Sequence, residues 1–390
     1  MAVAGIPLHW DIFCSVVDNY GDVGVAWRLA RQLASEHGVA VRLFVDALAA
    51  LSRLAPQVDA GSDEQGVQKV DVLSWDGPQK DAPRAAVAAL GDVVIEAFGC
   101  GLPPNYLAAM EGHAMQPVWI NLEYLSAEDW IESCHGLASR HSRRSLTRHF
   151  FFPGFTAHAG GLLRERHLFA RRDAFRARPE EQAALWHMLG VDPPPAEALK
   201  VSLFCYPDAP LQTLLDAWAN GSDAIFCAVP EGVADAAIDA WLATATAASG
   251  RSFRGGALTV ARVPFVSHED YDRLLWACDL NFVRGEDSFV RAQWAATPLI
   301  WHCYPQTDAA HVAKLGAFIA RYDVGLAQGA STAYAAFSRR WNGDAAGVLS
   351  WSALTRVLPD LQTHAQGWAR ALAEQKDLAS NLVKFAADRV

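Results

Sequence analysis

The first forty-five residues alternate between short apolar runs and one amphipathic stretch in a fixed order. A nearly continuous apolar run at 10–17 is typical of a strand buried on both faces. The turn 18–22 follows, and apolar residues then recur every fourth position up to Gly38, as expected for a helix. A second apolar run occupies 39–45. Strand, helix and strand in this order predict a βαβ unit, which requires a parallel sheet.

The same alternation continues along the rest of the chain, which we expect to be an α/β protein with two βαβ-type halves. A charged segment with three consecutive prolines at 193–195 marks the boundary, so we predict domains at 1–190 and 191–390. Ligands of such sheets bind beyond the carboxyl ends of the strands, here in a cleft between the halves. Further strands are expected at 92–96, 117–121, 199–206, 223–229, 258–263, 279–283 and 299–301, and helices at 271–278, after 288 up to 296, and from 353 onward.

Composition narrows the possible partners and the cellular compartment. Hydrophobic residues make up 52% of the chain, enough to bury large cores. The formal charge of −10 repels phosphate, which argues against nucleic acid and anionic membranes as partners. The seven cysteines are scattered without a Cys-x-x-Cys pair, so most are expected to be small buried hydrophobes. Without a signal peptide or an apolar stretch of membrane-spanning length, we expect a cytoplasmic protein.

Two carboxylates lie in the turn that follows the first strand. The segment Asp18-Asn19-Tyr20-Gly21-Asp22 does not form a Gly-x-Gly-x-x-Gly fingerprint, and its acids would repel a diphosphate. The turn therefore suits a cation or a proton, as a base or as a clamp for a guanidinium group. The alternative is that Asp18 forms the turn and Asp22 is a helix N-cap.

A second candidate loop is Arg284-Gly285-Glu286-Asp287-Ser288, which leads into a helix. Glycine allows close backbone approach, and the helix start offers N–H groups and a positive dipole end to a diphosphate. Arg284 and Ser288 could add donors, and the carboxylates could accept sugar hydroxyls. The alternative is helix capping by Asp287 or Ser288. Near this loop we expect four aromatic side chains that could stack on a base or belong to the core: Tyr206, Phe265, His268 and Tyr304. We interpret His302 and His311 as structural.

Several longer motifs resemble one known family. The sequence is similar to the EarP family, the bacterial protein-arginine rhamnosyltransferases that modify elongation factor P. The motifs are DIFC at 11–14, DNYGDVG at 18–24, WRLAR at 27–31, NLEYLSAE at 121–128, GGLLRER at 160–166, VPFV at 263–266, RGEDSFVRAQ at 284–293 and WHCYPQ at 301–306. They span most of the chain.

The resemblance implies a GT-B glycosyltransferase with two Rossmann-like domains, the acceptor side on the first and the nucleotide sugar on the second. It implies dTDP-β-L-rhamnose as co-substrate, elongation factor P as acceptor, inversion at the sugar, and no metal or other cofactor. It places catalytic carboxylates at Asp22, as base, and Glu286, with Asp18 near the acceptor guanidinium. Histidine stands at 268 where the resemblance leads us to expect glutamine. The implied donor contacts are Asn19, Tyr20, Gly21, Tyr206, Phe265, Asp287, Ser288, Phe289 and Val290.

The chemistry of the acidic turn agrees with this resemblance. An arginine side chain stays protonated because its pKa exceeds roughly 12, so it needs carboxylates to align it and to take a proton. Three alternatives remain: a GT-B enzyme acting on a small molecule or glycan, a nicotinamide-dependent dehydrogenase, and a module that binds elongation factor P without modifying it. The missing glycine fingerprint argues against the dehydrogenase, and the paired aspartates argue against the small-molecule enzyme.

Overall fold

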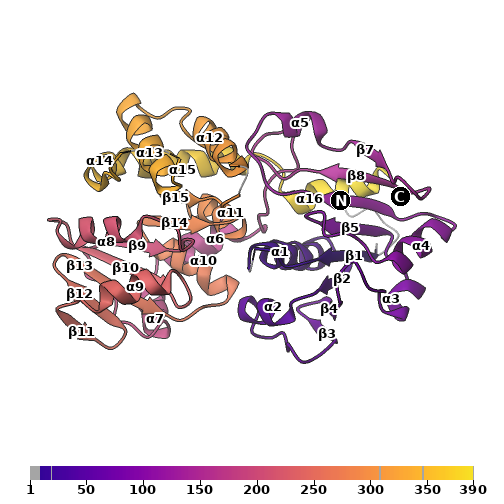
Figure 1. Cartoon of the computed structure of the whole chain (residues 1–390), viewed down its shortest axis with the longest axis horizontal. Coiled ribbons are helices and arrows are strands. Elements are labelled where there is room, and N and C mark those ends of the chain that lie inside the picture. Colours follow the sequence, from indigo (N-terminus) through magenta and orange to yellow (C-terminus); the bar gives the residue numbers. More distant parts are fainter. Residues whose placement is uncertain (1–8, 19, 307–308, 345–346, 390) are drawn as a thin grey trace. The chain divides into compact units, whose positions relative to one another are not determined.

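The computed structural model describes residues 9–18, 20–306, 309–344 and 347–389, and the chain forms two compact units. Unit 1 ends at Arg166 and resumes at Ala373, whereas unit 2 is the continuous segment His167–Leu372. This division differs from the predicted boundary after residue 190. Helix α6 (Leu168–Arg176) packs on helices of unit 2, and the last helix, α16 (Leu378–Ala387), drawn in yellow in Figure 1, packs on unit 1.

Unit 1 is built on an eight-stranded sheet with the order β3-β4-β2-β1-β5-β6-β8-β7. All neighbours pair in parallel except the edge strands β3 and β7, which are antiparallel. The strands are β1 (His9–Cys14), β2 (Ala40–Val45), β3 (Glu64–Val67), β4 (Val70–Ser74), β5 (Val93–Ala97), β6 (Val118–Leu122), β7 (Ala138–Arg140) and β8 (Thr147–Phe151). Besides α16, the helices are α1 (Gly21–Glu36), α2 (Leu48–Leu54), α3 (Arg84–Ala88), α4 (Pro104–Gly112) and α5 (Trp130–Cys134).

The central strand β1 is buried on both faces, as its apolar sequence predicts. Phe13 stacks on Phe44 of β2 with ring centroids 4.3 Å apart. Asp11 interrupts the apolar run and is fully buried, but both of its carboxylate oxygens accept hydrogen bonds from Arg42, at 2.7 and 2.6 Å. A buried carboxylate is tolerated because this bidentate partner compensates for its desolvation.

Hydrogen bonds from Arg164 hold the segment of chain that returns to unit 1 at Ala373. Its guanidinium donates to the carbonyls of Ala373, at 2.6 Å, and Gln375, at 3.1 Å. The amide of Gln32 on α1 then donates to Asp377, at 3.0 Å, just before α16. The outgoing and returning segments of the chain therefore lie together on unit 1.

Unit 2 contains a seven-stranded sheet with the order β11-β12-β13-β10-β9-β14-β15 (Figure 1). Its centre is parallel, and β11, β12 and β13 form an antiparallel edge. The strands are β9 (Leu199–Leu203), β10 (Ile225–Pro230), β11 (Ala247–Ser249), β12 (Ser252–Gly255), β13 (Leu258–Val263), β14 (Leu280–Arg284) and β15 (Leu299–His302). Besides α6, the helices are α7 (Pro179–Met188), α8 (Leu211–Ala219), α9 (Asp235–Leu242), α10 (His268–Ala277), α11 (Asp287–Ala295), α12 (Ala310–Tyr322), α13 (Gln328–Trp341), α14 (Trp351–Arg356) and α15 (Leu358–Ala373).

Most elements expected from the sequence are present, and one helix begins earlier than expected. The side chain of Ser267 accepts the N–H of Asp270 at 3.2 Å, so α10 starts at His268 rather than at Tyr271. All seven cysteines are free thiols and five of them are buried, which confirms their prediction as small hydrophobes. Within the described part of the chain, every helix is too short or too polar to cross a bilayer.

Candidate active site

The acidic turn of unit 1 connects β1 to α1, and Asp22 holds it closed. Asp22 is 2% exposed, and its Oδ2 accepts the backbone N–H groups of Val17, at 2.7 Å, and Asp18, at 2.8 Å. The N-cap position is Tyr20, without a side-chain bond, so the alternative interpretation of Asp22 as the N-cap is wrong. The Asp22 carboxylate instead accepts hydrogen bonds from residues that precede it in the turn. Both bonds go to Oδ2, and neither goes to Oδ1.

Gly21 makes room in the same turn for the carboxylate of Asp18. A Cβ atom at this position would lie 2.8 Å from Asp18 Oδ2, closer than real Cβ contacts come. The guanidinium carbon of Arg53 lies 5.8 Å from the ring centroid of Tyr20. The predicted donor contact Asn19 lies outside the described residues. The structure thus brings Asp18 and Asp22 together through a shared backbone hydrogen bond and a glycine.

Replacing Gly21 with alanine is therefore expected to displace Asp18 without unfolding the protein. Alanine suits a first helical position, so the melting temperature should change little. The displaced carboxylate should lower the kcat/KM of a reaction at this turn by about tenfold, since small misplacements at a reacting centre are costly. Steady-state kinetics with thermal unfolding check both parts. Gly112→Ala in α4, where a Cβ would meet nothing within 4 Å, is the control. Unchanged kcat/KM in Gly21→Ala would show that the position of Asp18 is unimportant.

In unit 2 the second candidate loop turns sharply at Gly285. This residue has φ of +60°, a left-handed conformation that favours glycine. The indole N–H of Trp301 donates to its carbonyl at 2.8 Å, which holds the loop against β15. Glu286 then occupies the N-cap position of α11 without a side-chain capping bond. The N–H groups of the first turn of α11 are therefore not capped by the Glu286 side chain.

Ser288 and Arg284 shape this loop from within. The Ser288 hydroxyl accepts the Arg284 N–H at 3.1 Å and donates to the Arg284 carbonyl. The N-cap is Glu286, so the alternative interpretation, helix capping by Asp287 or Ser288, is wrong. The Arg284 guanidinium donates to the carbonyl of Cys205 at 3.1 Å and lies over the ring of Tyr206, 4.8 Å from its centroid. Arg284 thus ties the carboxyl end of β14 to the segment after β9.

An aromatic cluster follows β9 and β15. Tyr206 is buried and meets the rings of His302, at 5.2 Å, and the exposed Tyr304, at 5.6 Å, edge to face. The Nδ1 of His302 accepts the N–H of Tyr206 at 3.3 Å, and its Nε2 lies 3.7 Å from Asp208. Burial lowers the pKa of His302 to about 4, so the ring is neutral with its proton on Nε2. His302 therefore has a structural role in this cluster.

The remaining predicted donor contacts fall into two groups. Phe289 is fully buried and stacks on Trp301, with centroids 4.0 Å apart, and Val290 is buried beside it on α11. Phe265 is half-buried between β13 and α10, and His268 is buried at the start of α10 with Nε2 3.5 Å from Asp287 Oδ2. The structure thus brings His268 and Asp287 together.

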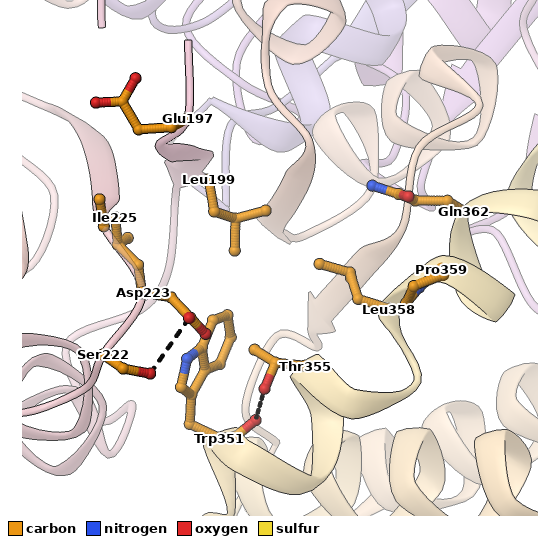
Figure 2. Close-up of a pocket in the computed structure, with 11 residues that line it drawn as sticks. Glu197, Leu199, Ser222, Asp223, Ile225, Trp351, Thr355, Leu358, Pro359 and Gln362 are labelled. Atoms are coloured by element: carbon orange, nitrogen blue, oxygen red, sulfur yellow. Dashed lines mark hydrogen bonds between the residues drawn. The ribbon is translucent and has the colours of Figure 1, made fainter. Parts of the chain in front are cut away.

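A cavity of about 540 Å³ in unit 2 lies away from these residues. Figure 2 shows Leu199 and Ile225, the first residues of β9 and β10, across from Leu358 of α15, with Trp351 of α14 below them. The cavity thus lies at the amino ends of β9 and β10, whereas the candidate residue Tyr206 follows the carboxyl end of β9. None of the predicted site residues that the structure describes lines it.

Sequence reasoning did not identify Asp272 or Arg291, which form a buried ion pair between α10 and α11. In the sequence each charge lies one helical turn after another polar residue, His268 or Asp287, and this spacing does not identify the partner on the other helix. Among residues 9–18, 20–306, 309–344 and 347–389, no three His, Cys, Asp or Glu side chains are grouped as a metal ion would require.

Comparison with known proteins confirms the resemblance seen in the motifs. The family model for the elongation factor P rhamnosyltransferase EarP matches residues 10–387. A protein-arginine rhamnosyltransferase of Pseudomonas putida is 50% identical over 376 residues, covering 96% of this chain and 98% of that protein. A solved structure from work on EarP-mediated arginine glycosylation of elongation factor P is 39% identical, with a TM-score of 0.69, and covers 98% of this chain and 100% of its own.

More distant solved structures support the fold alone. The GT-B glycosyltransferase MurG of Acinetobacter baumannii is 12% identical with a TM-score of 0.50, and covers 98% of this chain and 100% of its own. Two parallel-rich sheets in separate units are the architecture of that fold, so the predicted GT-B class is confirmed. The extent of the family match and the identity over nearly the whole chain show that this protein belongs to the EarP family of elongation factor P rhamnosyltransferases.

Proposed function

We propose that this chain transfers L-rhamnose from dTDP-β-L-rhamnose to one arginine of elongation factor P, with inversion at the anomeric carbon. The observation that carries the proposal is the Asp22 carboxylate, buried after the central strand and held through one oxygen by two backbone N–H groups. A family member with such a carboxylate has the base that an arginine acceptor requires. The reaction is expected in the cytoplasm, where elongation factor P works.

The acceptor chemistry follows from the two aspartates of the turn. A guanidinium group can donate charge-assisted hydrogen bonds to Asp18 and Asp22, which align it and localise its positive charge. As one guanidinium nitrogen attacks the anomeric carbon, the new N–C bond forms and Asp22 accepts the proton. The bond between the anomeric carbon and the diphosphate oxygen breaks on the opposite face, so the configuration inverts.

The donor chemistry relies on the start of α11. The first-turn N–H groups and the positive dipole end can stabilise the departing dTDP, which carries the negative charge. Gly285 allows the backbone to approach the diphosphate, and Glu286 can accept hydrogen bonds from sugar hydroxyls. In this proposal neither a metal ion nor another cofactor takes part.

Phe265 is expected to stack on the thymine base. Phe265→Ala should weaken dTDP binding by about 1–3 kcal/mol, the usual effect of removing a stacked aromatic ring. Calorimetric titration with dTDP measures this loss. Phe253→Ala, which removes another half-buried ring on β12 of the same unit, should leave the affinity unchanged. Equal dTDP affinities of Phe265→Ala and the wild type would exclude Phe265 from the donor site.

Intact-mass spectrometry of elongation factor P, incubated with this protein and dTDP-β-L-rhamnose, tests the function. We expect a gain of one deoxyhexose, mapped to a single arginine and abolished when that arginine is changed to lysine. A missing gain in the presence of measurable dTDP binding would contradict the proposed acceptor and favour a small molecule or glycan instead. Loss of both transfer and binding would contradict the donor as well.

A further inference from the structure

Two buried side-chain contacts, called rungs below, join α10 to α11. The first rung is His268 with Asp287, whose Nε2 and Oδ2 atoms are 3.5 Å apart at the start of both helices. The second rung is Asp272 with Arg291, at 2.9 Å from Nε to Oδ1 and 2.6 Å from Nη2 to Oδ2. On each helix the two rung residues are four positions apart, so they lie on one face, one turn from each other.

The second rung has the geometry that fixes one helix against another. A bidentate guanidinium–carboxylate pair restrains direction as well as distance, because both hydrogen bonds must stay parallel. Arg291 is 1% exposed and Asp272 is 2% exposed, so water does not compete for these bonds. A buried ion pair adds little net stability compared with apolar side chains of similar size. This pair is therefore better suited to setting a geometry than to stabilising the fold.

By restraining α11 against α10, the second rung also fixes the positions of the first rung and of the loop before α11. Asp287 lies one turn before Arg291 on α11, in the first turn, whose N–H groups follow Glu286. His268 lies one turn before Asp272 on α10, three residues after Phe265. Sliding or rotating α11 against α10 would move all of these groups relative to each other.

We propose that Asp272 and Arg291 are positioning residues for the nucleotide-sugar site: their bidentate pair sets the register of α11 on α10 and thereby places the donor-binding groups at both helix starts. This inference rests on the proposed function. It adds a pair that has no contact with the donor itself and acts through α11.

The opposite ends of the same helices provide a matched control. Arg176 of α6 donates to the carbonyl of Trp276, at 3.0 Å, and to that of Ala295, at 2.7 Å. These carbonyls lie at the carboxyl ends of α10 and α11, far along the helices from the site. Arg176→Lys therefore perturbs a contact at the far ends of the two helices and leaves both rungs, and the register that they set, intact.

The experiment compares the wild type with Arg291→Lys, with the double variant Asp272→Leu/Arg291→Met, and with the Arg176→Lys control. Arg291→Lys keeps the charge but loses the bidentate geometry. The double variant removes both charges, so no unpaired charge stays buried and the protein should remain folded. Thermal unfolding, calorimetric titration with dTDP, and separate KM values for dTDP-β-L-rhamnose and elongation factor P are measured for each protein.

Both rung variants should bind dTDP about tenfold more weakly and show a raised donor KM, with the KM for elongation factor P unchanged. Arg176→Lys should lower the melting temperature and leave dTDP affinity unchanged. A folded double variant that binds dTDP as tightly as the wild type would overturn the inference. A wild type that neither binds dTDP nor modifies elongation factor P would instead overturn the proposed function, and the inference with it.

Discussion

Asp22→Asn is expected to lower kcat for arginine rhamnosylation by about 10²–10⁴-fold, the usual contribution of a general base. Asparagine keeps an oxygen that can accept the N–H groups of Val17 and Asp18, so the turn should keep its shape. The negative charge of Asp22 and its ability to take a proton are lost, while the Asp18 carboxylate stays to bind the guanidinium. The affinities for dTDP and elongation factor P should therefore stay close to those of the wild type.

Single-turnover mass spectrometry measures the loss, and calorimetric titration checks that both substrates still bind. The matched control is Asp46→Asn, because the Asp46 carboxylate accepts the N–H of Val16 at 2.9 Å in the same connection. This control removes one negative charge beside the turn without removing the base. Normal turnover by Asp22→Asn would end its assignment as the base and leave a binding module or another base as explanations.

Glu286→Gln is expected to lower kcat by about 10²-fold, the loss expected when one preorganised hydrogen bond to developing charge is weakened. Positive charge develops on the sugar ring as the diphosphate leaves, and a carboxylate bonded to a sugar hydroxyl stabilises it. Glutamine can still accept that hydrogen bond but carries no charge. The effect should therefore appear in kcat more than in the donor KM.

Steady-state kinetics with varied dTDP-β-L-rhamnose separate these two quantities. Glu197→Gln is the control, because Glu197 is an exposed acid of unit 2 that lines the cavity in Figure 2, at the opposite end of the sheet. It makes the same chemical change and should leave both constants unchanged. A raised donor KM with normal kcat in Glu286→Gln would show that Glu286 serves binding alone.

The central strands could be predicted from the sequence because each is a short, mostly apolar run. Strand β13 matches its predicted range 258–263 at both ends. Strand β1 ends at Cys14 instead of Val17, since the carboxylates of Asp46 and Asp22 take the next backbone N–H groups. Such side-chain acceptors, whether near in the sequence as Asp22 or distant as Asp46, leave no pattern in the apolar run itself. The short edge strands were not predicted because their residues are polar or exposed, as in β11.

The candidate loops could be predicted because their residues are contiguous and follow strand ends. The contacts that each side chain makes in these loops could not be predicted. Ser288 could add a donor to a diphosphate, and nothing in the sequence indicates that its hydroxyl bonds to the backbone of Arg284. The partner of His302 is Asp208 in the loop after β9, and that of Arg291 is Asp272 on α10. A pair between distant segments is not encoded by spacing.

The return of the chain to unit 1 determines the order in which the protein can be completed during synthesis. Unit 2 is one continuous segment, so the ribosome finishes it while α16 is still unmade. Unit 1 lacks the Gln32–Asp377 bond and the carbonyl partners of Arg164 until the last residues emerge. Although domains usually fold in the order of synthesis, here the unit that starts first is completed last.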